Sequence, residues 1–121
     1  MQAVTPWPVT DPFLQLSGAR LKGALIAGAG RVLAKRDDLN RINVFPVPDG
    51  DTGTNLAFTM LAVLKTTRRL RGADLGTVLG KVARDAIDGA RGNSGAILAQ
   101  FFQGLAEVLG RQPVAGAREL A

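Results

Sequence analysis

The sequence predicts an all-α protein, folded as an antiparallel bundle or barrel of helices. Three observations predict this class. Apolar residues recur at helical spacing in four stretches, no segment alternates convincingly as a strand would, and short turns join the stretches. The chain has 121 residues, of which 46% are hydrophobic, enough to build one core. Residues 1–11 are expected to form an N-terminal arm, and residues 12–121 the folded domain.

Each helix is expected from its apolar face and its boundary residues. The first begins at Asp11 and Pro12, a cap acceptor followed by a proline at the first helical position. The glycines at 18, 23, 28 and 30 either weaken this helix or allow close helix packing. Asp74 can cap the third helix, and the final "VAGARELA" is expected to begin a further one. The four helices are expected at about 12–35, 55–70, 75–89, and 94 or 95 to 109.

The composition narrows the chemistry available to an enzyme. The chain has no His, Cys or Tyr, which excludes disulfides, thiolate metal sites and the usual proton shuttles. Carboxylates and lysines remain, and they suit a reaction driven by positioning and charge, such as phosphoryl transfer. The sequence has no signal peptide and no apolar run long enough for a transmembrane segment. A cytoplasmic protein is therefore expected.

The charge balance favours an anionic partner. The net charge is +5, from 15 Lys+Arg against 10 Asp+Glu, which suits a nucleotide but also fits a solvated, arginine-rich surface. The basic residues are scattered, with one dense cluster at 65–71, and aromatic residues make up only 5% of the chain. These features argue against a nucleic-acid-binding domain.

Turn residues and oxygen donors are concentrated in "NVFPVPDGDTGTN", from Asn43 to Asn55. Its prolines exclude a helix, and Gly50 and Gly53 permit tight turns with unshielded amides. A helix follows, and a helix N-terminus accepts phosphate readily. The segment ends with three residues that can cap this helix, Thr52, Thr54 and Asn55.

Two carboxylates, Asp49 and Asp51, stand beside this helix start. Such hard oxygen donors suit Mg²⁺, which usually binds through one or two carboxylates together with substrate phosphates. The segment therefore supplies carboxylates for a metal ion and amides for phosphates. A calcium-binding loop does not fit, because Met60 stands where its final Glu is required.

A second glycine-rich break, "GNSG" at Gly92–Gly95, precedes the fourth expected helix. Asn93 and Ser94 are cap residues, and the glycines allow close backbone approach to a ligand. In an up-down bundle the second and fourth helices begin at the same end, so the two breaks could hold one polyphosphate between them. The alternative is that both segments are only caps and turns, since their residues are ordinary cap residues.

The two segments resemble a known family. The stretches "LNRINVFPVPDGDTGTNLAFTM" (Leu39–Met60) and "GARGNSGAILAQFFQGL" (Gly89–Leu105) resemble the ATP-binding L domain (DhaL-like) of the dihydroxyacetone kinase family. Within that family the chain is most similar to the N-terminal kinase domain of bacterial fatty-acid kinase. The resemblance covers about Phe13 to Leu109, and the two motifs occur in the family's order.

The resemblance implies an eight-helix antiparallel barrel that binds ATP or ADP at one rim with two Mg²⁺ ions. Asp49 and Asp51 match the two close carboxylates of the family, as metal ligands and catalytic residues. Asn43 lies near the place of a third metal-binding aspartate of dihydroxyacetone kinases. Contacts to phosphate or nucleotide are implied for Thr52, Gly53, Thr54, Asn55, Gly92, Asn93, Ser94 and Gly95.

The resemblance also implies the reaction and the partner. In fatty-acid kinase the acceptor is a fatty acid carried by a separate DegV-like binding protein, and an acyl phosphate forms. A carboxylate acceptor is already ionised near pH 7 and needs no base. Two alternatives stay open, a nucleotide subunit of a dihydroxyacetone-type kinase and a non-catalytic regulatory module of the same fold.

The family's domain continues past residue 121, so the chain is expected to represent a truncated part of the barrel. Apolar residues that other helices would cover are then left exposed on the fourth helix. A large exposed apolar patch is unusual on a soluble monomer, so a homo-oligomer is expected. The residues of this face are Leu98, Phe101, Phe102 and Leu105.

Overall fold

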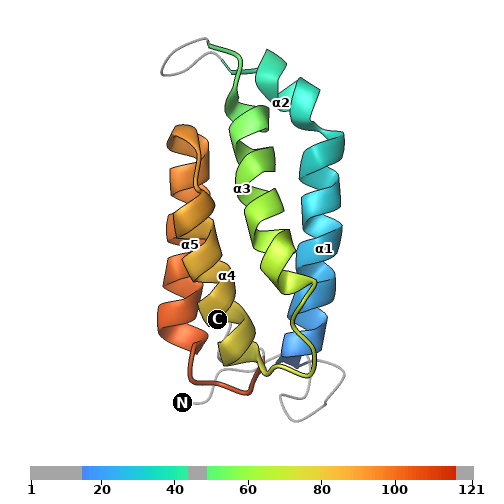
Figure 1. The fold of residues 1–121 in the computed structure, drawn as a ribbon, viewed down its shortest axis with the longest axis vertical. Helices are drawn as coiled ribbons and strands as arrows, with labels where there is room; N and C mark the ends of the chain where they lie inside the picture. Colours follow the sequence, from blue (N-terminus) through green and yellow to red (C-terminus); the bar gives the residue numbers. More distant parts are fainter. Residues whose placement is uncertain (1–14, 44–48, 117–121) are drawn as a thin grey trace, which may run out of the picture.

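The chain forms five helices and one short two-stranded sheet over the residues that the structure describes. The structure is a computed structural model, and it describes residues 15–43 and 49–116. Figure 1 shows the long helices side by side, which confirms the all-α class. In chain order the elements are β1 (Leu16–Ser17), α1 (Gly18–Ala34), α2 (Arg36–Arg41), α3 (Thr52–Thr67), α4 (Leu75–Gly89), α5 (Gly92–Leu109) and β2 (Val114–Ala115).

The long helices alternate in direction along the bundle. Helix α3 contacts α1, α4 and α5, and the short α2 lies against its beginning. Because α4 carries the chain back along α3, helices α3 and α5 begin at the same end, at the top of Figure 1. The fold therefore places the two glycine-rich helix starts at one end of the bundle, as the up-down arrangement predicts.

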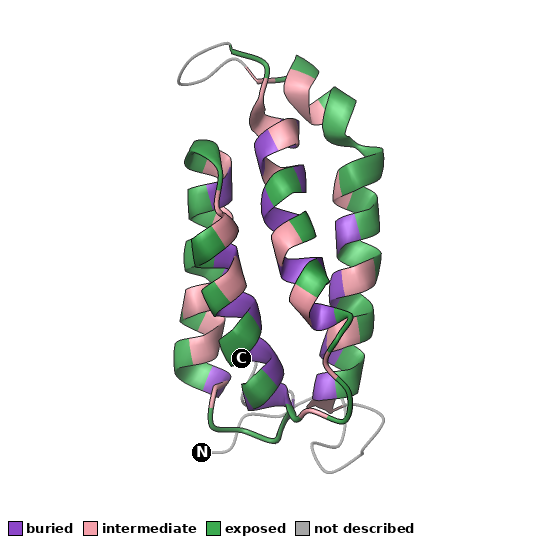
Figure 2. Ribbon diagram, in the orientation of Figure 1, coloured by how far each residue is buried: buried purple, intermediate pink, exposed green. Residues whose placement is uncertain are grey.

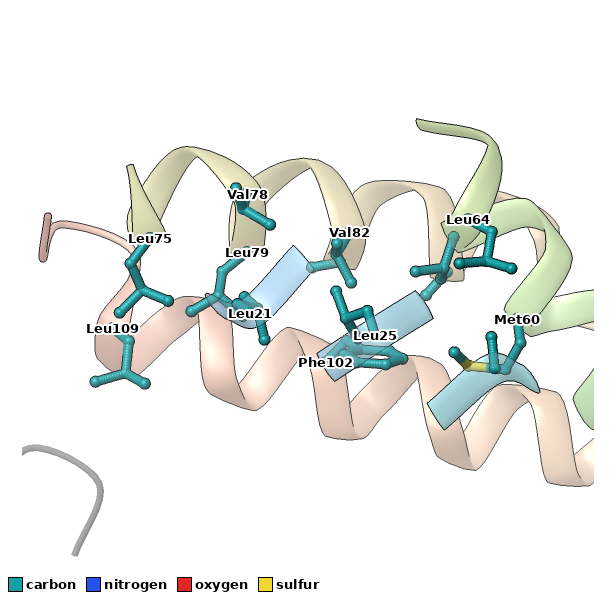
Figure 3. Close-up of a cluster of buried hydrophobic side chains, with 14 of the residues drawn as sticks. Leu21, Leu25, Met60, Leu64, Leu75, Val78, Leu79, Val82, Phe102 and Leu109 are labelled. Atoms are coloured by element: carbon teal, nitrogen blue, oxygen red, sulfur yellow. The ribbon is translucent and has the colours of Figure 1, made fainter. Parts of the chain in front are cut away.

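The core lies between α1, α3, α4 and α5. Figure 2 shows buried positions on the sides of these helices that face one another. The face expected for the third helix is confirmed, because its five residues are at most 2% exposed, and each large apolar side chain buried there stabilises the fold by about 1.5–3 kcal/mol. These five are Leu75, Val78, Leu79, Val82 and Ala86. Figure 3 shows side chains of α4 in one cluster with Leu21 and Leu25 of α1, Met60 and Leu64 of α3, and Phe102 and Leu109 of α5.

The first helix begins at Gly18, later than expected. Ser17 is its cap, with extended backbone at φ −102° and ψ 170°, and its hydroxyl accepts a hydrogen bond from the Arg20 backbone N–H at 3.2 Å. The expected start at Asp11 and Pro12 lies outside the described residues. The helical reading of 16–17 is wrong, because these residues pair with a second strand instead.

A two-residue strand pair, β1 and β2, lies at the end of the bundle opposite the two glycine-rich helix starts. The strands are antiparallel, with Leu16 opposite Ala115 and Ser17 opposite Val114. The expectation of no strand, and of a helix beginning at 114, is therefore wrong for residues up to 116. Residues 117–121 lie outside the described part of the chain. Such short strands show no alternation that a sequence pattern could reveal.

Other boundaries also differ from the expected ones, among them the end of α3, which lies at Thr67 and not at about 70. Residues 36–41, expected as a connection, form helix α2. Helix α3 begins three residues early, at Thr52, because side chains outside the helix bind its first N–H groups. Helix α5 begins at Gly92, because the Gly95 N–H already bonds the Arg91 carbonyl at 3.2 Å.

The glycines of α1 serve different purposes. A Cβ at Gly18 would lie 2.0 Å from the Ala73 carbonyl oxygen, so only glycine allows the loop before α4 to pack there. A Cβ at Gly23, Gly28 or Gly30 would meet no atom within 4 Å. Close packing is therefore found at Gly18, against a loop and not a helix, and the expectation of close helix packing is wrong at the other three.

Helix α5 keeps an exposed apolar stripe beside its buried face. Ile97, Phe101 and Val108 are 71%, 61% and 72% exposed, and their spacing of four and seven residues places them on one side of the helix. Of the four residues expected on the uncovered face, Phe101 alone is exposed. Phe102 is 5% exposed in the core, and Leu98 and Leu105 are partly buried against it. No helix among the described residues combines the length and apolarity needed to cross a bilayer.

Candidate functional site

Two asparagines, Asn40 and Asn43, bind the residues around the start of α3. Asn43 Oδ1 accepts hydrogen bonds from the backbone N–H groups of Asp51 and Thr52, both at 3.1 Å. Asn40, in α2, binds Thr54 twice: its Oδ1 accepts from the backbone N–H at 3.0 Å, and its Nδ2 donates to Oγ1 at 2.9 Å. These bonds satisfy N–H groups of the first helical turn, which have no partner within the helix.

Asp49 and Asp51 bring their carboxyl groups together before α3. The pKa of the Asp49 carboxyl lies above its ordinary value of 3.8, chiefly because of hydrogen bonding with the Asp51 side chain, then because of desolvation, and then because of the negative charge of Asp51. Gly50 lies between them with φ +68°, a conformation that glycine adopts without strain. Two carboxyl groups this close repel each other when both are ionised, and a bound cation relieves that repulsion.

Residues 91–95, the cap and first turn of α5, are called the second loop below, and they lie directly on the first turn of α3. The Ser94 hydroxyl donates a hydrogen bond to the Thr52 carbonyl oxygen at 3.2 Å. Gly92 has φ +66°, and a Cβ there would lie 2.2 Å from Asn55 Nδ2. Ser94 was also expected to cap the fourth helix, and this is wrong: the cap position is Arg91, without a side-chain cap bond. The fold thus joins the two segments that the sequence singled out.

A buried hydroxyl connects the second loop to α3. Thr59 is fully buried, and its Oγ1 donates to the Asn55 carbonyl at 2.9 Å and accepts from the Arg91 backbone N–H at 3.3 Å. The Arg91 guanidinium lies 4.1 Å from the centre of the Phe58 ring, in a cation–π contact. Two successive residues of α3 therefore hold Arg91 by its backbone and by its side chain.

Close packing accounts for two of the expected site glycines. A Cβ at Gly53 would lie 2.1 Å from the Arg36 carbonyl oxygen in α2, and one at Gly95 would lie 2.4 Å from Thr59 Oγ1. Both residues are buried. Their lack of a side chain lets α2 and α5 approach α3, whether or not their amides also contact a ligand. Asn93, by contrast, is exposed at the start of α5.

The oxygen ligands in this region suit a Mg²⁺ ion that is also bound by water and phosphate better than an ion whose ligands all come from the protein. Within residues 15–43 and 49–116, no three acidic, His or Cys side chains come close enough to hold an ion. Asp49 and Asp51 would supply the carboxylate ligands of a metal ion. Asn43 Oδ1 already accepts two backbone N–H bonds and would exchange one of them to bind a metal. Mg²⁺ commonly takes one or two carboxylates and completes its coordination with water and phosphate.

Sequence reasoning missed three contributors to this site, Asn40, Thr59 and the pair of Arg91 and Phe58. It also expected Thr52, Thr54 and Asn55 to cap α3, whereas Asn40 and Asn43 bind the first N–H groups. Asn43 was considered only as a metal ligand. An asparagine just before a proline-containing loop and a helix start is a signal that could have indicated capping from outside the helix.

A rival site at the opposite end is less suited to a ligand. A hollow of about 300 Å³ lies between the start of α1 and the loop after α3, lined by Lys22, Leu70 and Arg71 among others. Lys22 Nζ donates to the Leu70 carbonyl at 2.7 Å. Its charge therefore caps the C-terminal end of α3, where cations are favoured.

The chain is similar in sequence to several bacterial proteins. It is 35% identical to Protein YloV of Bacillus subtilis over 106 residues, which cover 88% of this chain and 19% of the relative. It is 33% identical to an uncharacterized protein of Staphylococcus saprophyticus over 107 residues, again 88% of this chain and 19% of the relative. An uncharacterized protein of Staphylococcus aureus is 36% identical over 90 residues, 74% of this chain and 16% of the relative.

The chain spans about a fifth of the length of these curated relatives. A sequence model described as the DAK2 domain matches residues 46–121, more than half of the chain. The matched part includes Asp49, Asp51 and the whole second loop, and the fold is all-α. The chain therefore belongs to the DAK2 domain family.

Proposed function

We propose that this chain binds Mg·ATP and forms the nucleotide-binding part of a kinase. The observation that carries the proposal is the junction of the two loops, where the Ser94 hydroxyl meets the Thr52 carbonyl beside two paired carboxylates. Two helix starts at one end of the bundle present positive dipole ends, which favour phosphate. Membership of the DAK2 family supports a dihydroxyacetone-kinase-like, nucleotide-binding domain.

Different residues of the proposed site would bind the metal ion and the phosphates of a Mg·nucleotide. Asp49 and Asp51 would hold Mg²⁺, and when bound the ion neutralises charge on the phosphate oxygens. At the start of α5 the exposed residues Gly92 and Asn93 would offer amides to the phosphates. At the start of α3, whose Thr52 and Thr54 amides are already bonded by Asn43 and Asn40, the hydroxyls of these two threonines would contribute instead. Asn40 and Asn43 fix the start of α3 before any ligand arrives, which lowers the entropy lost on binding. Asn43 would be a ligand of a second Mg²⁺ ion.

The proposed acceptor is the carboxylate of a fatty acid carried by a separate DegV-like binding protein. The absence of His, Cys and Tyr supports it, because a carboxylate acceptor requires no general base at pH 7. Dihydroxyacetone is the second candidate, because membership of the DAK2 family supports a dihydroxyacetone-kinase-like domain. Its hydroxyl would need a base, which another subunit would have to supply.

Two measurements test the proposal in order. Calorimetric titration with ADP, with and without Mg²⁺, should show binding that depends on the metal, and Glu107→Gln, an exposed carboxylate near the far end of α5, should bind like wild type. Phosphate transfer from ATP is then measured with a fatty acid on a DegV-like protein and with dihydroxyacetone. Transfer only to the fatty acid supports the proposal. Transfer only to dihydroxyacetone selects the second candidate, and metal-dependent binding without transfer to either favours a regulatory module.

A further inference from the structure

Thr59 and Thr67 are two buried threonines of α3 with different surroundings. Both are fully buried, and each donates its hydroxyl to the carbonyl four residues earlier, Thr59 to Asn55 at 2.9 Å and Thr67 to Val63 at 2.7 Å. The Thr59 hydroxyl also accepts a second bond, from the Arg91 backbone N–H at 3.3 Å. The local bond of each threonine is thus the same, and the bond to the second loop distinguishes them.

The contacts around Thr59 set the distance between the second loop and α3. Gly95 packs so closely that a Cβ would lie 2.4 Å from Thr59 Oγ1, and Arg91 is held at the other side of the same hydroxyl. Ser94, between them in sequence, reaches the Thr52 carbonyl at 3.2 Å. A buried hydroxyl with one donor and two acceptor sites can serve both α3 and the loop, whereas an apolar side chain of the same shape cannot.

We infer that Thr59 is a positioning residue of the nucleotide site, acting through the second loop and touching no ligand itself. This inference rests on the proposed function. By holding Arg91, Thr59 keeps Gly92–Gly95 against the first turn of α3, so that both loops face one polyphosphate. Losing this one hydrogen bond should weaken Mg·ADP binding by about five- to tenfold.

The test compares three variants. Thr59→Val removes the hydroxyl at nearly constant shape, Thr67→Val makes the same change two turns further along α3, and Thr59→Ser restores the hydroxyl. Calorimetry with Mg·ADP gives affinities, and hydrogen exchange of the amides of residues 91–95 reports on the loop without nucleotide. We expect weaker binding and faster exchange in Thr59→Val, wild-type values for both in Thr67→Val, and recovery in Thr59→Ser.

Each other outcome has a definite meaning. Thr59→Val with wild-type affinity, or an equal loss in Thr67→Val, would overturn the inference, because the hydroxyl would then serve the fold alone. If wild type shows no Mg·ADP binding, the proposed function fails. Faster loop exchange in Thr59→Val would in that case still support the anchoring step, and unchanged exchange would refute it as well.

Discussion

The Ser94 hydroxyl donates a hydrogen bond to the carbonyl oxygen of Thr52, 42 residues earlier in the chain, over 3.2 Å. This contact joins the start of α5 to the start of α3. It connects the two segments that are richest in turn residues and polar donors, and it places Ser94 beside the loop that carries Asp49 and Asp51. The contact also shows that Ser94 is committed to the junction and not to capping its own helix.

Removing the hydroxyl in Ser94→Ala should therefore lower nucleotide affinity more than stability. Ser17 provides the control, since its hydroxyl caps α1 at the far end of the bundle. Ser17→Ala should cost about 1 kcal/mol of unfolding free energy and leave affinity unchanged. Urea denaturation and ADP titration of both variants measure the difference. A Ser94→Ala protein that loses stability but binds ADP like wild type would reduce Ser94 to a structural role.

Two glycines of α1 should respond in opposite directions to the same substitution. Gly28→Ala should stabilise the protein by about 0.5–1 kcal/mol, because the site is open and alanine is the better helix former. Gly18→Ala should destabilise it by about 1–3 kcal/mol, since the new methyl would collide with the Ala73 carbonyl. Urea unfolding measures both. A loss of stability in Gly28→Ala would mean that this face of α1 is covered in solution.

Asp74 should make the stability of the fold depend on acid pH. Its carboxylate accepts the Thr77 N–H at 2.8 Å, and this bond, followed by one from the Thr77 side chain, lowers the pKa of Asp74 below 3.8. Because the pKa of Asp74 is lower in the folded state, the carboxylate stabilises the protein at pH values above 3.8, its ordinary pKa in the unfolded chain. This stabilisation is lost as the pH falls through the pKa of the folded state.

The melting temperature of Asp74→Ala should accordingly lie below that of wild type at pH 7, and the gap should narrow below pH 3.8. Asp74→Asn keeps a capping oxygen without the charge and serves as the control. A gap between wild type and Asp74→Ala that stays constant into acid would show that the charge of Asp74 is not what stabilises α4.

The exposed stripe of α5 predicts self-association of this chain. Ile97, Phe101 and Val108 present large apolar surfaces on one side of the helix. A two-fold dimer would bury the stripe twice. Phe101→Asp should raise the dimer dissociation constant by about tenfold or more, as expected when an aromatic residue at the centre of an interface is lost. Gln100→Asp, next to it but off the stripe, should change little. Sedimentation that finds a monomer for wild type at micromolar concentration would refute the prediction.

Much of the architecture could be predicted because it depends on local patterns. The buried face of α4 follows from apolar spacing, and Asp74 is an ordinary cap signal; both are confirmed. The common end of α3 and α5 follows from alternating helix direction. The strand pair at 16–17 and 114–115 could not be predicted, because two residues carry no periodicity and the partners lie about a hundred residues apart.

The meeting of the two polar segments at one end of the bundle could be predicted, but the residues that hold them together could not. Unusual turn chemistry marked the Asp49–Asn55 and Gly92–Gly95 segments, and the fold joins them. The support comes from Asn40, Asn43 and Thr59, ordinary residues whose roles depend on contacts between elements. Gly53 and Gly95 illustrate the same limit, because a glycine needed for packing has the same sequence signature as one that admits a ligand.

The most direct test of the account is the Mg²⁺ dependence of ADP binding in wild type and in Asp51→Asn. Asp51→Asn removes one of the two paired carboxylates but keeps an oxygen of the same reach, so the fold should persist. We predict that Mg²⁺ strengthens ADP binding to wild type and that this strengthening is largely lost in Asp51→Asn, while Glu107→Gln behaves like wild type. Equal Mg²⁺-dependent affinities of wild type and Asp51→Asn would contradict the assignment of the carboxylate pair as the metal site.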